Sequence, residues 1–136
     1  MLEHFLKQLA ADLELEAIPA KDESGTVHFF LNPEMVISIK EQNGQIFFLS
    51  KIASCPMQKR EQLFILLMKA NFLGQGTHGS VIALDPEEKV LTLSLTLPDG
   101  MGYHKFKENI EEFANYVDYW REEIATHQKE AENSLY

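Results

Sequence analysis

The segment 90–97 reads Val-Leu-Thr-Leu-Ser-Leu-Thr-Leu, with a leucine at every second position. Because successive side chains of a strand point to opposite faces, this pattern predicts a β-strand with one face in a core and the other towards water. Strands of this one-sided kind are typical of antiparallel sheets. The chain is therefore expected to build an antiparallel sheet that is covered on one face.

Further strands are expected where apolar, β-branched and aromatic runs lie between turn residues. The pair Asn43-Gly44 supplies the left-handed dihedral angles of a tight hairpin turn, so the strands on either side of it must run antiparallel. The pair Asn32-Pro33 marks another turn before it. The expected strands are 27–31, 35–39, 46–53, 81–84 and 90–97.

Three helices are expected from apolar residues at helical spacing, over residues 1–16, 61–73 and 106–124. The element order is then helix, three strands, helix, two strands, helix. This order predicts an α+β domain in which helices pack on an antiparallel sheet. We expect a single domain over residues 1–125 and a polar C-terminal tail over residues 126–136.

The second expected helix, Glu61 to Leu73, is apolar nearly all round, and a helix of this kind is buried on more than one side. One sheet can cover only one side of it in so small a domain. Either a second copy of the chain covers the other side, as in a homodimer, or the third helix does.

Size and charge narrow the class of protein. The 136 residues suit one domain, and 21 acidic against 12 basic side chains give a net charge of −9. This balance argues against nucleic acid and membrane surfaces as partners. The single cysteine, the missing signal peptide and the lack of a long apolar run predict a soluble protein of a reducing compartment, without membrane insertion.

The run Gly74-Gln75-Gly76-Thr77-His78-Gly79 matches the dinucleotide fingerprint G-x-G-x-x-G. That fingerprint requires a strand before it and a helix after it, because the helix N-terminus holds the pyrophosphate. Here the expected order is reversed. The run is therefore interpreted as a helix cap at Gly74 followed by a close approach of the backbone, and no cofactor is expected.

Other reactive side chains make no recognisable active site. Cys55 could act as a nucleophile with His78 or His104 as its base, but no local motif surrounds it. The five histidines are scattered and lack the spacing of metal ligands. We expect no enzyme activity, no cofactor and no metal.

The stretch from Leu67 to Asp85 resembles the central signature of the class I type III secretion chaperones, the family of the Tir chaperone. It reads Leu-Met-Lys-Ala-Asn-Phe-Leu-Gly-Gln-Gly-Thr-His-Gly-Ser-Val-Ile-Ala-Leu-Asp. The shared features are a helix ending in Ala-Asn, glycines with a threonine, and a strand closing on an aspartate. The leucine-alternating strand and an aromatic-rich last helix ending near Trp120 also fit. No special loop or extension points to one subclass.

The resemblance implies a small homodimer of the bacterial cytoplasm that takes part in virulence. Such a protein has no ATPase activity of its own. Its partner would be the N-terminal, chaperone-binding segment of one or more secreted effector proteins. That segment would wrap around the dimer in extended form and stay soluble and secretion-competent. The ATPase of the secretion apparatus is a further expected partner.

Two sets of residues are expected to make these contacts. The resemblance places the subunit contact on the second helix and the fourth strand, which are the elements with an apolar surplus; the expected residues are Phe64, Leu67, Met68, Phe72, Val81, Ile82 and Leu84. The first helix and the outer face of the meander are expected to bind cargo through Leu2, Phe5, Leu6, Leu9, Phe30, Phe47 and Leu49. Phe47 and Phe48 point to opposite faces, and the sequence does not decide which one faces outward.

Other functions remain open at this stage. The same cargo-binding surface could form a groove that sequesters a transcription factor or a sigma subunit, which would make the protein an interaction-type regulator. An enzyme that uses Cys55 or the glycine run is a further alternative. Identification of the bound partner would separate the first two hypotheses, and a Cys55→Ala variant would test the third.

Overall fold

The computed structural model describes residues 1–133, which form three α-helices, a short 3-10 helix and five strands. The helices are α1 (Leu2–Asp12), α2 (Arg60–Asn71) and α3 (Tyr103–Asn133), and the 3-10 helix η1 (Phe72–Gly74) follows α2 directly. The strands are β1 (Val27–Asn32), β2 (Met35–Gln42), β3 (Gln45–Ser54), β4 (Val81–Leu84) and β5 (Val90–Leu97). The element order predicted from the sequence is confirmed.

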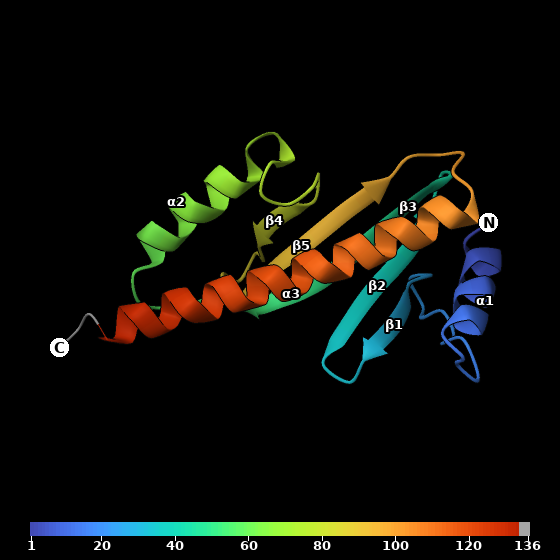
Figure 1. Ribbon diagram of the computed structural model, residues 1–136, viewed down its shortest axis with the longest axis horizontal. Coiled ribbons are helices and arrows are strands. Elements are labelled where there is room, and N and C mark those ends of the chain that lie inside the picture. Colours follow the sequence, from blue (N-terminus) through green and yellow to red (C-terminus); the bar gives the residue numbers. More distant parts are fainter. Residues whose placement is uncertain (134–136) are drawn as a thin grey trace.

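The five strands form one antiparallel sheet in the order β1-β2-β3-β5-β4 (Figure 1). The hairpin between β2 and β3 turns at Asn43 and Gly44, whose φ angles of 54° and 81° are those expected from the sequence. The fourth and fifth strands then add on the far side of β3. As a result β1 and β4 are the two edges of the sheet.

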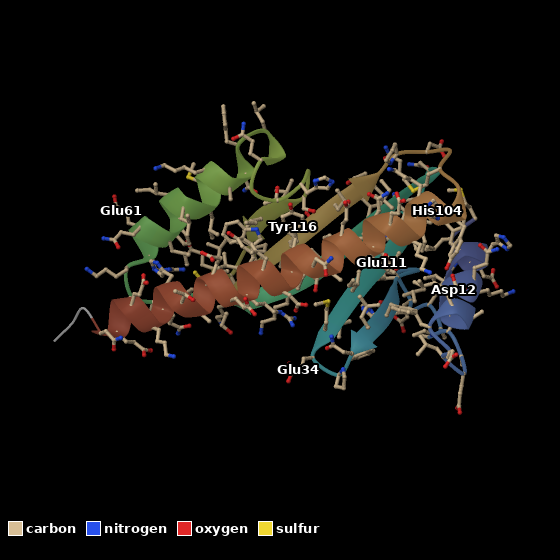
Figure 2. The ribbon with its side chains drawn as sticks, viewed as in Figure 1. Asp12, Glu34, Glu61, His104, Glu111 and Tyr116 are labelled. Atoms are coloured by element: carbon tan, nitrogen blue, oxygen red, sulfur yellow. The ribbon has the colours of Figure 1, made fainter. Side chains whose placement is uncertain are left out.

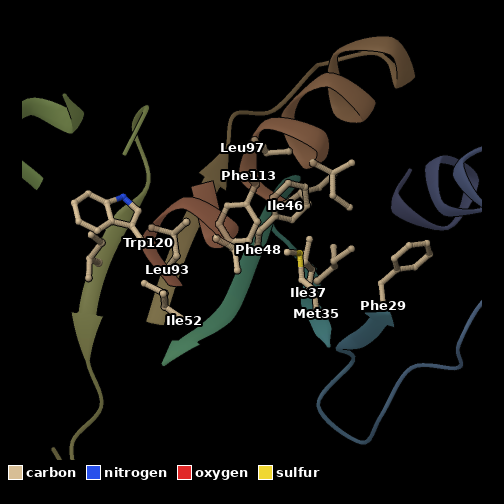
Figure 3. Close-up of a cluster of buried hydrophobic side chains, with 14 of the residues drawn as sticks. Phe29, Met35, Ile37, Ile46, Phe48, Ile52, Leu93, Leu97, Phe113 and Trp120 are labelled. Carbon is tan, nitrogen blue, oxygen red and sulfur yellow. The ribbon is translucent and has the colours of Figure 1, made fainter. Parts of the chain in front are cut away.

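Helix α3 runs across one face of the sheet, and the core lies between them (Figures 1 and 3). Phe48 of β3 contacts Phe106 and Phe113 of α3, with ring centroids 5.8 and 5.4 Å apart. Leu91, Leu93 and Leu97 of β5 are buried beneath the same helix, as the alternating pattern predicts. We call this covered side the inner face of the sheet and the opposite side the outer face.

Several helix ends differ from the prediction: α2 ends at Asn71, two residues early, α3 begins at Tyr103, and the largest differences are at the end of α1 and at the end of α3. Helix α1 stops at Asp12 because Glu14 takes a left-handed backbone with φ 57°, and the Leu15 amide closes the turn on the Ala10 carbonyl. The predicted helix to residue 16 is therefore wrong. At the other terminus, residues 126–133 of the expected polar tail are helical and continue α3, while 134–136 lie outside the described residues.

Candidate functional site

Helix α2 buries one side and exposes apolar side chains on the other. Leu63, Leu67 and Ala70 are buried in the core, on the side of α2 that contacts β4. Met68 and Phe72, by contrast, are 72% and 64% exposed. Helix α3 therefore does not cover the second side of α2, which was one of the two arrangements considered from the sequence. An exposed apolar helix face of this kind marks a contact surface.

A hollow of about 210 Å³ lies where α2 meets β4. It opens beside the exposed Met68. Seven apolar side chains line it, namely Phe64, Leu67, Met68, Ile82, Ala83, Leu84 and Leu91. Five of the seven residues expected at a subunit contact therefore border one depression, and the other two, Phe72 and Val81, are exposed.

Asn71, the last residue of α2, seals the edge of β4. Its side-chain amide donates to the Ile82 carbonyl and its side-chain oxygen accepts from the Ile82 amide, both at 2.8 Å. These two bonds replace the partner strand that β4 lacks on this side. Sequence reasoning missed this role, although Asn71 is the second residue of the Ala-Asn pair that closes the helix in the family signature.

The outer face of the sheet carries uncovered aromatic and aliphatic side chains. Phe30 is 56% and Leu49 is 47% exposed, and Phe47 is half-buried on the same face. Phe29 and Phe48 point the other way and are buried. The choice between Phe47 and Phe48, which the sequence leaves open, is settled in favour of Phe47 as the outward residue.

A loop is fastened to the β1 margin of the outer face through His28. The His28 ring contacts the Ser38 hydroxyl through Nδ1 and the Asp22 carboxylate through Nε2, each at 2.9 Å. The Ser24 hydroxyl and the Thr26 amide donate to the same carboxylate and hold the pKa of Asp22 far below its usual range. This loop therefore forms a fixed rim beside Phe30.

Helix α1 does not present the surface that the sequence led us to expect. All four of its expected cargo residues are buried in this chain, and the Phe5 ring packs on Phe106 with centroids 5.1 Å apart. The physical reason is that α1 packs beside α3 at the end of the sheet and needs its apolar stripe for that contact. The residues corrected from exposed to buried are Leu2, Phe5, Leu6 and Leu9.

Polar contacts also fix α1 on α3. The Tyr103 hydroxyl donates to the Asp12 carboxylate, and the Lys107 ammonium lies 3.4 Å from it. Figure 2 labels Asp12 at the α1 end of the molecule. The Tyr103 hydrogen bond lowers the pKa of Asp12, while burial and the same bond raise the pKa of Tyr103 to about 12.

A second groove, of about 760 Å³, lies between α2, the glycine run and α3. The Trp120 indole donates to the Gly76 carbonyl at 3.0 Å, and Tyr119 is exposed beside it. Tyr116, labelled in Figure 2, stacks on the His78 ring. The groove is continuous with the exposed side of α2, because Leu66 and Lys69 line it too.

The glycine run lies between a helix and a strand, as predicted, and so lacks the geometry of a dinucleotide site. Gly74 has φ 69°, and a Cβ at Gly76 would approach the Ala70 Cα and Cβ to 2.9 Å. The run is a tight connection whose glycines permit left-handed backbone and close packing on α2. The predicted close backbone approach is confirmed at Gly76, but the predicted helix cap at Gly74 is wrong, because α2 ends at Asn71 and η1 follows it.

The other candidate reactive groups lie apart from one another. The Cys55 thiol is buried and accepts from the Arg60 guanidinium at 3.3 Å. His78 pairs with Glu112, and His104 pairs with Glu108 on the surface of α3. Over residues 1–133, no three His, Cys, Asp or Glu side chains gather as a metal site requires. Nor does that part of the chain contain a helix long and apolar enough to cross a bilayer.

Solved structures share this fold. A chain of the HopA1-SchA chaperone-effector complex matches with TM-score 0.69 and 14% identity, covering 89% of this chain and 93% of that one. A chain of the ExsC-ExsE complex matches with TM-score 0.74 and 11% identity, covering 89% of this chain and 91% of that one. YbjN of E. coli, described as a candidate transcription regulator, matches with TM-score 0.64 and 16% identity, covering 94% of this chain and 93% of that one. At these identities the likeness establishes the fold alone.

The structure is an α+β fold with two uncovered apolar surfaces, one on α2 and one on the outer face of the sheet. The model of the Tir chaperone protein (CesT) family matches residues 4–121, which is nearly the whole described chain. The protein therefore belongs to the Tir chaperone family, as the resemblance in segment 67–85 indicates. Among curated proteins, no sequence matches this chain as a relative.

Proposed function

We propose that this protein is a type III secretion chaperone. It acts as a homodimer in the bacterial cytoplasm and binds the N-terminal segment of secreted effector proteins. The observation that carries the proposal is the pair of uncovered apolar surfaces, on α2 and on the outer face of the sheet, in a member of the Tir chaperone family. A soluble chain that exposes two such surfaces needs two kinds of partner.

The first surface supports the dimer. Met68 and Phe72 are exposed, and the hollow between α2 and β4 is lined in part by Met68. Val81 of β4 is also exposed and by the strand register lies on the outer face of the sheet, at its β4 edge. Obligate interfaces resemble a core cut in half, with apolar side chains and depressions that the partner fills. Because Asn71 already satisfies the Ile82 backbone, the contact between subunits relies on side-chain packing at this position.

The second surface supports cargo binding. Phe30, Phe47 and Leu49 lie on the outer face, where an extended segment can cover them. Burial of such a side chain contributes about 1.5–3 kcal/mol before the ordering of the segment is counted. Covered in this way, the segment stays extended and available to the secretion apparatus, whose ATPase is the expected recipient. No nucleotide is needed for the binding itself.

Purification of the protein from the producing cell tests this function directly. We expect a secreted protein to co-purify, and its N-terminal segment alone to suffice for binding. The variants Phe30→Asp and Phe47→Asp should reduce the yield of that protein, whereas Gln128→Asp, a change at an exposed position on α3, should not. Recovery of no secreted protein would contradict the proposal.

A regulator of the same fold is the second candidate, and the likeness to YbjN supports it. In that case the co-purifying protein would be a transcription factor or a sigma subunit in place of a secreted one. Addition of ATP, NAD or zinc separates both candidates from an enzyme, because a ligand that binds only the native state must raise Tm. We expect no change in Tm, and a rise of several degrees would revive the enzyme hypothesis.

A further inference from the structure

The outer face of the sheet differs in charge from the rest of the molecule. Residues that share this face with Phe30 and Leu49 can be assigned from the strand register. Within the described strands they include two lysines and no aspartate or glutamate. The central part of the face consists of Phe30, Val36, Ser38, Lys40, Phe47, Leu49 and Lys51, which we call the outer-face patch.

The two lysines flank the apolar part of the outer-face patch. Lys40 lies directly opposite Phe47 on the neighbouring strand, and Lys51 follows Leu49 by two residues on β3. Among the described residues, neither ammonium group lies within ion-pair distance of a carboxylate. Their charges are therefore available to a ligand that covers the patch.

The excess of carboxylates responsible for the net charge of −9 lies elsewhere. Exposed acidic side chains are spread along α3, and one of them, Glu111, is labelled in Figure 2. Helix α3 covers the inner face of the sheet, so these carboxylates lie away from the outer face. At physiological ionic strength, exposed charges farther apart than about 8 Å are largely screened. The Asp22 carboxylate at the β1 margin of the outer face is already bound by His28, Ser24 and Thr26. A ligand on the central part of the face is therefore affected mainly by Lys40 and Lys51 and only weakly by the net charge.

We propose that the outer-face patch selects an extended partner segment in which apolar side chains and carboxylates alternate along one side. This inference rests on the proposed function and specifies the chemistry of the cargo segment. It runs against the net charge, which would favour a basic segment.

The spacing of the two lysines also sets a pattern for the occupant. Lys51 lies four residues beyond Phe47, the residue opposite Lys40, which is about 13 Å along the strand at about 3.3 Å per residue. In an extended segment, residues i and i+4 point to the same side and are separated by the same distance. The expected pattern is a carboxylate, an apolar residue two positions on, and a second carboxylate two positions further.

Two synthetic peptides test the inference. Both peptides carry the same apolar residue at the centre of the pattern. The residues two positions before and two positions after it are glutamate in one peptide and lysine in the other. Fluorescence anisotropy at physiological salt should give a Kd about tenfold lower for the glutamate peptide. The paired change Lys40→Glu with Lys51→Glu should reverse this order, and Lys40→Gln with Lys51→Gln should abolish the preference.

Lys105→Glu with Lys129→Glu is the matched control, since it changes the net charge equally but on α3. This control should keep the preference for the glutamate peptide. A preference of the wild-type protein for the lysine peptide would overturn the inference, as would equal effects of the two Lys→Glu pairs or binding of neither peptide. A change of oligomeric state caused only by the Lys40 and Lys51 changes would identify the face as a contact between copies and would also overturn it.

The outcome is independent of the test of function. If a secreted protein co-purifies but the lysine peptide binds better, the chaperone function holds and the inference about charge is wrong. If the glutamate peptide binds as expected but no secreted protein co-purifies, the surface is a peptide site and the proposed function is wrong.

Discussion

Helices α1 and α2 are nearly equal in length, at 11 and 12 residues, and both are rich in leucine. They use their apolar side chains in different ways. Helix α1 buries its whole stripe in its own chain, with Leu6 only 1% exposed. Helix α2 buries Leu63, Leu67 and Ala70 but leaves Ile65 and Met68 in solvent.

The difference follows from where each helix lies. Helix α1 packs against α3 at one end of the sheet, so a single apolar stripe is enough to attach it. Helix α2 lies beside the short edge strand β4, which gives it a neighbour on one side (Figure 1). One apolar stripe is thus satisfied within the chain, whereas a helix that is apolar nearly all round leaves Ile65 and Met68 exposed.

The largest expected effect is on α1. The change Phe5→Asp places a carboxylate in the core beside Phe106 and should unfold the protein, with a loss of more than about 4 kcal/mol in the free energy of unfolding. Circular dichroism during thermal unfolding measures this loss. His4→Asp is the control, because its position is exposed on the same helix. A Phe5→Asp protein with the wild-type Tm would return α1 to the list of cargo surfaces.

A different outcome is expected on α2. Met68→Asp should leave the chain folded but raise the dissociation constant of the dimer. The expected loss in the free energy of dimerisation is about 2 kcal/mol or more, the value typical of a residue at the centre of an interface. Sedimentation at micromolar concentration checks this, with Gln62→Asp as the control on an exposed polar position of α2. Leu67→Asp should instead unfold the chain, because Leu67 is buried within it. A Met68→Asp protein that dimerises normally would exclude α2 as the interface.

A smaller effect is expected where α2 attaches to the sheet. Asn71→Ala removes both hydrogen bonds to Ile82 and should lower the free energy of unfolding by about 1–3 kcal/mol. Urea denaturation measures the loss, and faster exchange of the Ile82 amide hydrogen would locate it. Asn115→Ala on the exposed surface of α3 serves as the control. Equal losses in the two variants would mean that Asn71 does not seal β4.

The smallest effect concerns the polar contact that fixes α1, and it depends on pH. Because the folded pKa of Asp12 is lowered, its contribution is present above the ordinary carboxyl pKa of about 4 and is lost as the pH falls through the folded value. The folded pKa of Tyr103 is raised to about 12, so its contribution is present below about pH 10 and is lost as the pH rises through 12.

Tyr103→Phe should therefore be less stable than the wild-type protein near neutral pH, and the difference in Tm should shrink in acid and in strong base. Thermal unfolding at several pH values checks this, with Tyr119→Phe, an exposed tyrosine of α3, as the control. A difference in Tm that is constant from acid to base would show that the Tyr103 and Asp12 contact does not contribute.

Most of the fold could be predicted because it depends on local patterns. The alternating leucines of 90–97 placed β5, and Asn43-Gly44 placed the hairpin between β2 and β3. The candidate site was predicted less well. The surplus on α2 and the outward aromatics of the meander were expected, but α1 was expected on the surface and is part of the core. An apolar stripe shows that a helix is covered, and it does not show by what.

The sequence by itself therefore determined the elements, their order and the one-sided character of the sheet, because propensity, turn residues and periodicity act over a few neighbouring residues. Only the tertiary structure decided which of Phe47 and Phe48 faces outward, that Asn71 seals β4, and that Lys40 and Lys51 flank one apolar patch. These features depend on strand register and on contacts between residues far apart in the chain. A shift of one residue in the pairing would reverse every face, and nothing local fixes that choice.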